Sequence, residues 1–192
     1  DPEKHADIHA MVREGRAGST IWLHGAEDVL QFQKMAVEES RLGVPLLIGW
    51  DVIHGFRTIF PIGLAMACTF SPEDAEISER IAAREASASG IHWTYAPMID
   101  MTREPRWGRI AESPGEDPYL ASVLTAARVR GFQGEDLANP ETLMSCAKHF
   151  VAYGAAECGR DYNSTDPSDR TLREFYLPPY CAAVAEGTGS VM

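Results

Sequence analysis

The sequence has no apolar run that approaches the roughly 18 residues of a membrane span, so we expect no membrane partner. Its four cysteines show no CxxC spacing, the pattern typical of zinc and redox motifs. Neither GxGxxG nor GxxxxGKS/T follows a predicted strand, which removes the usual nucleotide-binding signatures. Basic residues are few, 17 Lys and Arg against 28 Asp and Glu, and the net charge of -11 argues against a nucleic-acid partner.

The residues that are present are typical of a folded globular protein. With 45% hydrophobic and 23% charged residues, the chain has enough apolar material for one sizeable core. The opening DPEKHADIHAMVREG is typical of an amphipathic helix rather than a signal peptide. Short β-rich runs then alternate with helical segments. The predicted strands are 19–24, 45–52, 91–98, 143–151 and 189–192.

Helical segments lie between these strands, at 26–42, 71–90, 117–131 and from 171 onward. Ser71 and Asp117 are the predicted N-caps of the middle two, because each is followed by a first-turn proline. Thr171 begins a capping-box pattern with the glutamate three residues later, so it is the predicted start of the fourth. The pair Pro178-Pro179 must kink or split this last helix.

Strands separated by helical segments predict a parallel sheet covered by helices, an α/β fold. Polar residues follow the strands: Asp51 and His54 after the second, 100–109 after the third, and Lys148 and His149 at the end of the fourth. Active sites of (β/α)8 barrels are built from strand ends, so this placement favours a TIM-type barrel over an open sheet. A full barrel takes about 250 residues. With four β/α units and the start of a fifth, we predict one incomplete barrel domain.

Six segments carry a resemblance to a known family. They are GWDVIHGFRTIFPIGLA (49–65), GIHWTYAPMIDMTREPRWGR (90–109), ESPGEDPYL (112–120), AKHFVAYG (147–154), GRDYN (159–163) and RTLREFYLPPY (170–180). In this order they resemble the N-terminal domain of glycoside hydrolase family 3, closest to the bacterial periplasmic β-glucosidases. The resemblance implies a TIM-type barrel, followed in full-length members by an α/β sandwich and often by a fibronectin-like domain. Residues 1–192 are then the N-terminal part of the barrel domain, with the rest of the barrel and the second domain absent.

The resemblance also implies an activity, the retaining, double-displacement hydrolysis of terminal non-reducing β-D-glucosyl residues. The expected partner is a small-molecule β-glucoside or oligosaccharide, with no cofactor and no metal. The expected location is the periplasm or the outside of the cell.

By the resemblance, the sugar hydroxyls are bound by Asp51, Arg109, Lys148 and His149. The chemistry suits this role. The carboxylate of Asp51 offers two acceptor oxygens, and the guanidinium of Arg109 offers a planar fork of donors. The ammonium of Lys148 offers three donors, and the imidazole of His149 offers one donor or acceptor. Charge-assisted hydrogen bonds are also stronger than neutral ones. Adjacent residues on a regular strand point to opposite faces, so Lys148 and His149 share a face only if the backbone departs from a strand. The resemblance implies non-proline cis peptides around this Lys-His-Phe.

Other interpretations of these residues stay open. Asp51 is also typical of a helix cap or a turn, and Lys148 of a Schiff-base lysine in an aldolase barrel. Arg109 has three nearby acidic partners as alternatives to a ligand, Glu104, Glu112 and Glu116.

Three further features have two interpretations each. Trp107 either stacks on a sugar or packs as structural filler. Arg160, Asp161 and Tyr162 either edge the sugar pocket or order the loop after the fourth strand. His5 and His9 have the i, i+4 spacing of metal ligands, but no third ligand lies near them in the sequence, so we expect no metal.

The catalytic carboxylates cannot be assigned in this sequence. A retaining glycosidase needs two of them about 5 to 5.5 Å apart. The family's nucleophile is an aspartate in a motif like SDW, which does not occur here, so we expect it C-terminal to Met192. The acid/base of the glucosidase branch comes from the second domain. The Asp-His pair of the N-acetylglucosaminidase branch is missing from VAYGAAECGRDYN.

Two hypotheses follow. In the first, the chain is a fragment of a β-glucosidase that supplies the sugar-binding half of the site and is inactive alone. In the second, it is a non-catalytic half-barrel that binds sugar or assembles with another chain. An incomplete barrel exposes two sheet edges, so homo-oligomerisation is the natural way to cover them.

Overall fold

The computed structural model describes residues 2–192, with side chains from Ile8 onward. Within this part, every strand runs parallel to its neighbours. The strands are β1 (Ser19–Ile21), β2 (Leu47–Trp50), β3 (Trp93–Thr94), β4 (Cys146–Ala147) and β5 (Ser190–Val191). Each lies inside one of the predicted segments and is shorter than it. The five strand positions are therefore confirmed, and their predicted lengths are wrong.

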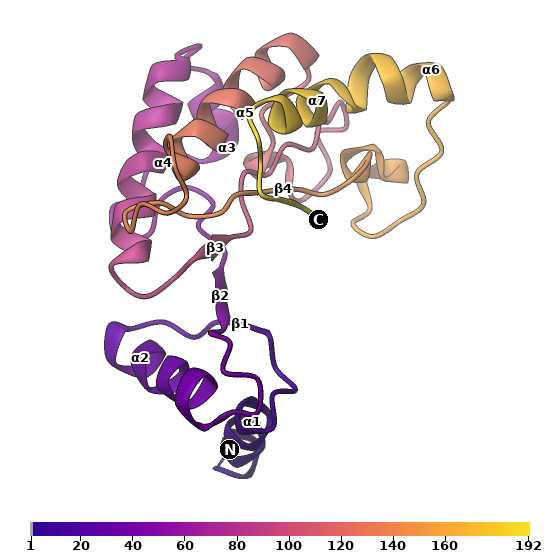
Figure 1. Ribbon diagram of the computed structural model, residues 1–192. Coiled ribbons are helices and arrows are strands. Elements are labelled where there is room, and N and C mark those ends of the chain that lie inside the picture. Colours follow the sequence, from indigo (N-terminus) through magenta and orange to yellow (C-terminus); the bar gives the residue numbers. More distant parts are fainter. Residues whose placement is uncertain (1) are drawn as a thin grey trace.

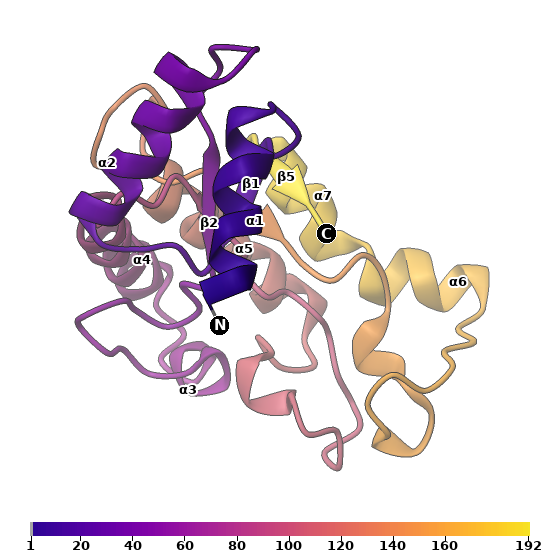
Figure 2. The ribbon, with the colours of Figure 1, turned by 90° about the horizontal axis from the view of Figure 1, so that it is seen from below.

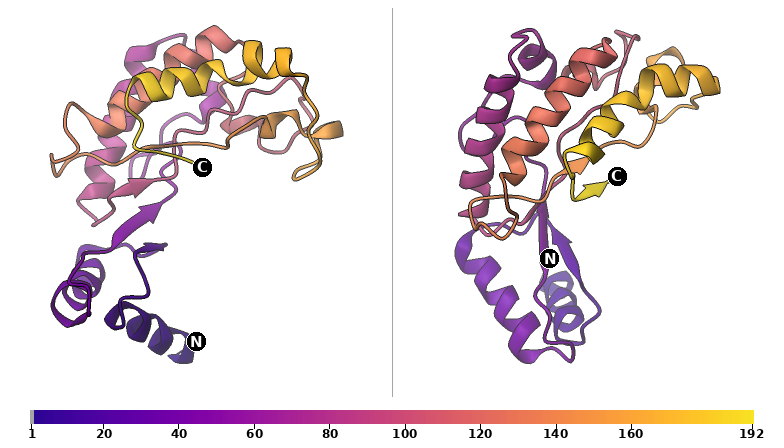
Figure 3. Two further views of the ribbon diagram at one scale, coloured as in Figure 1. Left: turned by 45° about the vertical axis from the view of Figure 1, so that its right-hand side comes forward. Right: turned by 45° about the horizontal axis from the view of Figure 1, so that its top comes forward.

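The strands follow one another in space as they do along the chain. β1, β2 and β3 form one sheet, and β4 and β5 form a second. Parallel bridges between Trp93 and Met144 and between Met98 and Lys148 join the two sheets. The result is a parallel arc from β1 to β5. Figure 3 gives two further views of the ribbon, with the helices outside the strands. This is the strand order of a (β/α)8 barrel, present here over part of the barrel, as predicted.

Helices cover one side of the arc. They are α1 (Pro2–Arg13), α2 (Ala26–Lys34), α3 (Gly63–Ala67), α4 (Pro72–Ser87), α5 (Pro118–Gln133), α6 (Asp169–Thr171) and α7 (Pro178–Ala185). The π-helical turns Met35–Glu39 and Leu172–Tyr176 extend α2 and α6. The helices α4, α5 and α7 pack against one another in this order (Figure 1). α1 and α2 lie at the end of the arc that carries β1 and β2 (Figure 2).

The N-caps predicted for the two long helices are confirmed. Ser71 Oγ accepts the backbone N–H of Asp74 at 3.1 Å, at the start of α4. Asp117 Oδ1 accepts the backbone N–H of Leu120 at 2.7 Å, at the start of α5. Each side chain satisfies a donor that has no partner within its own helix.

The start of α6 differs from the prediction. The N-cap is Ser168, whose Oγ accepts the backbone N–H of Thr171 at 3.2 Å. Ser168 has the extended backbone that an N-cap requires, at φ -62 and ψ 156. Thr171 lies inside the helix at φ -61 and ψ -40, so the predicted capping box is wrong. The proline pair does split the segment, because Pro178 begins α7.

Small residues bring the helices close to one another and to the strands. The side of α4 that faces the core carries four buried alanines, at 75, 82, 83 and 86. On α5, a Cβ at Gly131 would lie 2.5 Å from the backbone oxygen of Glu76. The two helices therefore pack backbone to backbone, and α5 reaches the strand ends with its buried polar face.

Candidate active site

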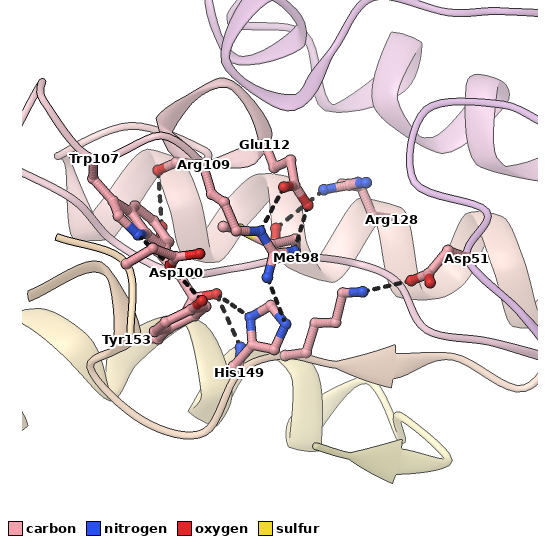
Figure 4. A network of polar contacts seen from close by, with 12 residues as sticks. Asp51, Met98, Asp100, Trp107, Arg109, Glu112, Arg128, His149 and Tyr153 are labelled. Carbon is pink, nitrogen blue, oxygen red and sulfur yellow. Dashed lines mark hydrogen bonds and ion pairs between the residues drawn. The ribbon is translucent and has the colours of Figure 1, made fainter. Parts of the chain in front are cut away.

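Polar side chains from three strand ends meet at one place (Figure 4). Asp51 follows β2, Asp100 and Arg109 lie in the loop after β3, and Lys148 and His149 follow β4. The structure thus brings together all four residues predicted to bind a ligand. They meet as two pairs, Asp51 with Lys148 at 2.6 Å and Arg109 with His149 at 3.3 Å. They lie at the carboxyl ends of parallel strands, where barrel enzymes place their active sites.

Asp51 and Lys148 form an ion pair between the ends of β2 and β4. Lys148 Nζ donates to Asp51 Oδ1 at 2.6 Å, and the lysine side chain is buried while the aspartate is 31% exposed. A buried ammonium requires an anionic partner. Asp51 supplies it, and the next helix begins only at Gly63, so the helix-cap interpretation fails. A Schiff-base lysine needs a free amine, which counts against the aldolase interpretation.

His149 is held by Asp100. Its Nδ1 lies 2.7 Å from Asp100 Oδ2, which also accepts the backbone N–H of His149 at 3.0 Å. Arg109 Nη1 lies 3.3 Å from Nε2 on the other side of the ring. Because a guanidinium only donates, Nε2 is the acceptor and Nδ1 carries the proton. His149 therefore presents an acceptor atom to the site.

Asp100 itself is completely enclosed. Burial raises the pKa of its carboxyl group, and the hydrogen bonds from His149 oppose this rise. In the described part of the chain, its second oxygen Oδ1 is buried without a hydrogen-bond partner. The carboxylate therefore serves one neighbour only, and it does not open toward a ligand.

The backbone around Lys148 departs from a regular strand, as predicted. The peptide bonds Lys148–His149 and Phe150–Val151 are both cis. The two adjacent side chains turn into the same network, where Lys148 contacts Asp51 and His149 contacts Arg109.

Arg109 is fixed by Glu112, three residues further along a 3₁₀ turn (Ile110–Glu112). Its Nε and Nη2 donate to the two carboxylate oxygens at 2.6 and 2.7 Å. Burial would raise the pKa of Glu112, but the hydrogen bonds and charge of Arg109 lower it overall. Of the three acidic partners considered, Glu112 is the correct one, whereas Glu104 pairs with Arg106. This arrangement leaves Nη1 of Arg109 directed at His149.

Aromatic residues form the wall beside His149 and Arg109. The ring of Tyr153 lies edge-on to His149, with centroids 5.0 Å apart, and 5.6 Å from the guanidinium carbon of Arg109. Trp107 also packs edge-on against Tyr153. It is fully buried, so it is structural filler and offers no face to a sugar.

The loop after β4 is ordered by Asp161. Asp161 Oδ1 accepts Trp107 Nε1–H at 3.0 Å and also the hydroxyl of Tyr153. These hydrogen bonds, that of Tyr153 first, lower the pKa of Asp161. Arg160 is exposed, and Tyr162 is 86% exposed beside Tyr153. The loop-ordering interpretation is therefore correct for Asp161.

Three remaining observations concern metals, thiols and membranes. The side chain of His5 lies outside the described residues, and the ring of His9 packs edge-on against Phe32. The described residues contain no group of three His, Cys, Asp or Glu side chains placed to hold a metal. The four cysteines are free, with only Cys146 buried. No described helix has the length and apolar character needed to cross a membrane.

Sequence reasoning missed Asp100 and Tyr153 as members of the site, and it left Glu112 as one of three candidate partners of Arg109. Asp100 and Glu112 lie in the family-like segments 90–109 and 112–120. Their roles depend on the basic side chain that each one contacts, His149 for Asp100 and Arg109 for Glu112. The only local signal was the i, i+3 spacing of Arg109 and Glu112. Asp100 and His149 are 49 residues apart, and only the fold pairs them.

Parallel β/α units that gather ionised side chains at their carboxyl ends place the chain in the (β/α)8-barrel class. Sequence comparison then gives the family. Residues 4–192 match the family described as Glycosyl hydrolase family 3 N terminal domain. The chain belongs to this family, as its motifs predicted.

Individual relatives agree with this assignment. The chain is 40% identical over 185 residues to a periplasmic beta-glucosidase of Salmonella typhimurium, covering 96% of this chain and 24% of the relative. It is 37% identical over 179 residues to a beta-xylosidase of Formosa agariphila, and this match covers 86% of this chain and 25% of the relative. A beta-glucosidase of Listeria innocua has been solved with glucose and, as a mutant, with laminaribiose. Both structures match this chain with a TM-score of 0.88 and 46% sequence identity. The match covers 92% of this chain and 25% of the Listeria chain. The chain thus spans about a quarter of the length of these relatives.

Proposed function

We propose that this chain supplies the glycone-binding part of a retaining β-glucosidase site. The observation that carries the proposal is the convergence of Asp51, Arg109, Lys148 and His149 at the carboxyl ends of β2, β3 and β4. A terminal glucosyl residue presents hydroxyls that both donate and accept hydrogen bonds. This site offers both kinds of partner, with charge to strengthen them.

Each of the four side chains has a distinct role in this proposal. Lys148 donates one proton to Asp51 and keeps two for sugar oxygens. Asp51, about one-third exposed, accepts from a sugar hydroxyl. Arg109 Nη1 and His149 Nε2 are 3.3 Å apart, a long hydrogen bond. One sugar hydroxyl accepts from the arginine and donates to the histidine, and so replaces this bond with two.

The bond-breaking carboxylates are proposed to lie outside the 192 residues. Asp51 is paired with Lys148, Asp100 with His149 and Glu112 with Arg109. Each of these carboxylates therefore already serves a neighbour in the site. We assign the nucleophile to an aspartate C-terminal to Met192 and the acid/base to a second domain. The coverage of about a quarter of the relatives supports this assignment.

The proposed substrate is a small β-glucoside or oligosaccharide, and the proposed location is the periplasm or outside the cell. The name of the Salmonella relative supports both. The Formosa relative, a beta-xylosidase, makes β-xylosides the second substrate candidate.

The test is hydrolysis of p-nitrophenyl β-D-glucoside and p-nitrophenyl β-D-xyloside by the 192-residue chain and by the full-length protein that carries it. We expect the full-length protein to hydrolyse the glucoside with retention, and the short chain to be inactive. Activity of the short chain would instead place the bond-breaking carboxylates within the 192 residues. Hydrolysis of the xyloside alone would move the assignment to a β-xylosidase.

A non-catalytic half-barrel that assembles with another copy is the second candidate function. It is favoured by the strands at the two ends of the arc, β1 and β5, each of which pairs on one side only within the described residues. Trp22, directly after β1, is 57% exposed. A second copy that covers these edges would bury both features.

A further inference from the structure

Arg128 lies behind the site, on the buried face of α5. Its side chain is 9% exposed, and its Nε donates to Oε1 of Glu79 on α4 at 2.5 Å, where the glutamate is 5% exposed. Ion pairs as enclosed as this one cost free energy to desolvate, and they contribute little to stability unless further hydrogen bonds complete them. Because the ion pair alone contributes little to stability, the role of Arg128 is indicated by its other hydrogen-bond partners.

The other two nitrogens of the guanidinium reach two different strand ends. Nη2 donates to the backbone oxygen of Ile53 at 2.9 Å, and Nη1 to that of Met98 at 3.3 Å. Ile53 lies two residues after Asp51. Met98 lies directly opposite Lys148 in the parallel bridge between the ends of β3 and β4. Figure 4 shows Arg128 beside Met98, whose backbone oxygen accepts from it.

One planar group thus holds the main chain on both sides of the Asp51–Lys148 ion pair. Asp51 is tied through Ile53, and Lys148 through its bridge to Met98. The nitrogens of a guanidinium have fixed separations, so the group sets a distance that a lysine cannot set. Glu79 orients the guanidinium from the opposite side and balances its charge.

We propose that Arg128 is a positioning residue for the glycone site, setting the separation of Asp51 and Lys148 through the carbonyl groups of Ile53 and Met98. The proposal rests on the proposed function for its effect on sugar binding. Its effect on geometry is independent of any ligand.

The test compares Arg128→Lys with Arg130→Lys in the full-length protein. Arg130 lies on the same helix and pairs with Glu76 and Glu186 nearer the surface, so its substitution controls for the general effect of replacing an ion-paired arginine on α5 with lysine. Glucose binding is measured by calorimetry. We expect Arg128→Lys to weaken it roughly ten- to a hundredfold, the cost of a small misplacement of binding groups, and Arg130→Lys to leave it unchanged.

A double-mutant cycle with Asp51→Asn separates positioning from a general structural role. If Arg128 acts through Asp51, its substitution has a smaller effect in the Asp51→Asn background than in the wild type. Equal fold losses in the two backgrounds, or unchanged binding by Arg128→Lys, would overturn the proposal.

Crystal structures of the two variants give a readout that needs no sugar. In Arg128→Lys, we expect the distance between Lys148 Nζ and Asp51 Oδ1 to lengthen beyond a hydrogen bond, roughly 3.5 Å, while Arg130→Lys keeps it at 2.6 Å. An unchanged distance in Arg128→Lys would also overturn the proposal. If the wild type binds no glucose, the proposed function fails, and the crystal structures still decide the role of Arg128.

Discussion

Asp100 determines which nitrogen of His149 faces the site. It accepts the proton on Nδ1, so Nε2 keeps its lone pair for the site. A carboxylate this enclosed is costly, because burial disfavours its charge. This free-energy cost of burying Asp100 is offset if Nε2 of His149, held as an acceptor, binds a sugar hydroxyl more tightly.

The role of Asp100 can be tested with two substitutions. Asp100→Asn keeps an oxygen that accepts from Nδ1–H, whereas Asp100→Ala leaves that donor without a partner. We expect glucose binding to fall about tenfold more in the alanine variant, in line with a lost hydrogen bond to a charged group. Calorimetry on the full-length protein measures this. Equal affinities of the two variants would contradict the role.

Asp100 also predicts a pH dependence of stability. Its folded pKa lies above the ordinary value of 3.8, because burial favours the protonated form. The protonated group therefore stabilises the fold below 3.8, and this contribution is lost as the pH rises through the folded pKa. Between neutral pH and 3.8, the unfolding free energy of the wild type should rise relative to that of Asp100→Asn as the pH falls. Urea titrations at several pH values measure the difference, and a difference independent of pH would contradict the raised pKa.

Asp51 has a structural as well as a binding role. Asp51→Ala leaves Lys148 as a buried cation without its partner, so we expect a loss of about 1–3 kcal/mol in unfolding free energy. Adding Lys148→Met should recover part of this loss, because no unpaired charge then remains buried. Urea unfolding of the three proteins checks both statements. A double variant less stable than Asp51→Ala would contradict the argument.

At the residue scale, the sequence predicted the members of the site better than their partners. Asp51, Lys148 and His149 could be found because each lies where a strand ends. Asp100, a neighbouring carboxylate, looks in the sequence like any solvated loop residue. Its complete burial and its contact with His149 exist only once the loops after β3 and β4 pack together.

Among the elements, helix starts were more predictable than strand lengths. The N-caps Ser71 and Asp117 are local devices, readable from a few residues. At α6, two capping residues compete within one turn, and Ser168 caps the helix because the chain is extended there and already helical at Thr171. Strand lengths depend on the neighbouring strand. β3 pairs with β2 over only two residues, Trp93 and Thr94, although the predicted strand runs from 91 to 98.

The contact between α4 and α5 gives a prediction at this scale. Gly131→Ala places a methyl group against the backbone oxygen of Glu76, so the helices must move apart and shift Arg128 with them. We expect a loss of about 1–3 kcal/mol in unfolding free energy, typical of overpacking, despite the higher helix propensity of alanine. Gly18→Ala is the control, because a Cβ there meets nothing within 4 Å. Thermal or urea unfolding compares the two, and equal stabilities would contradict the close packing.

For the whole molecule, the topology was predictable because alternating β and α segments leave few parallel arrangements. The edges of the arc give a prediction about association. If the 192-residue chain is produced alone, we expect its sedimentation coefficient to rise with concentration as strand edges pair. Ile21→Lys puts a charge on the edge strand β1 and should reduce this association. Ile59→Lys, at an exposed position outside β1, should not. A monomer at every concentration would contradict edge pairing.

The order of the strands has a consequence for how the chain folds during synthesis. Because β1 to β5 pair in the order in which a ribosome makes them, each new strand meets a neighbour that is already in place. Most of the arc can therefore assemble from its N-terminal end without waiting for distant segments. Asp51 leaves the ribosome long before Lys148, its partner across the site. The sugar-binding residues thus come together late, on a scaffold that their own elements have begun to build.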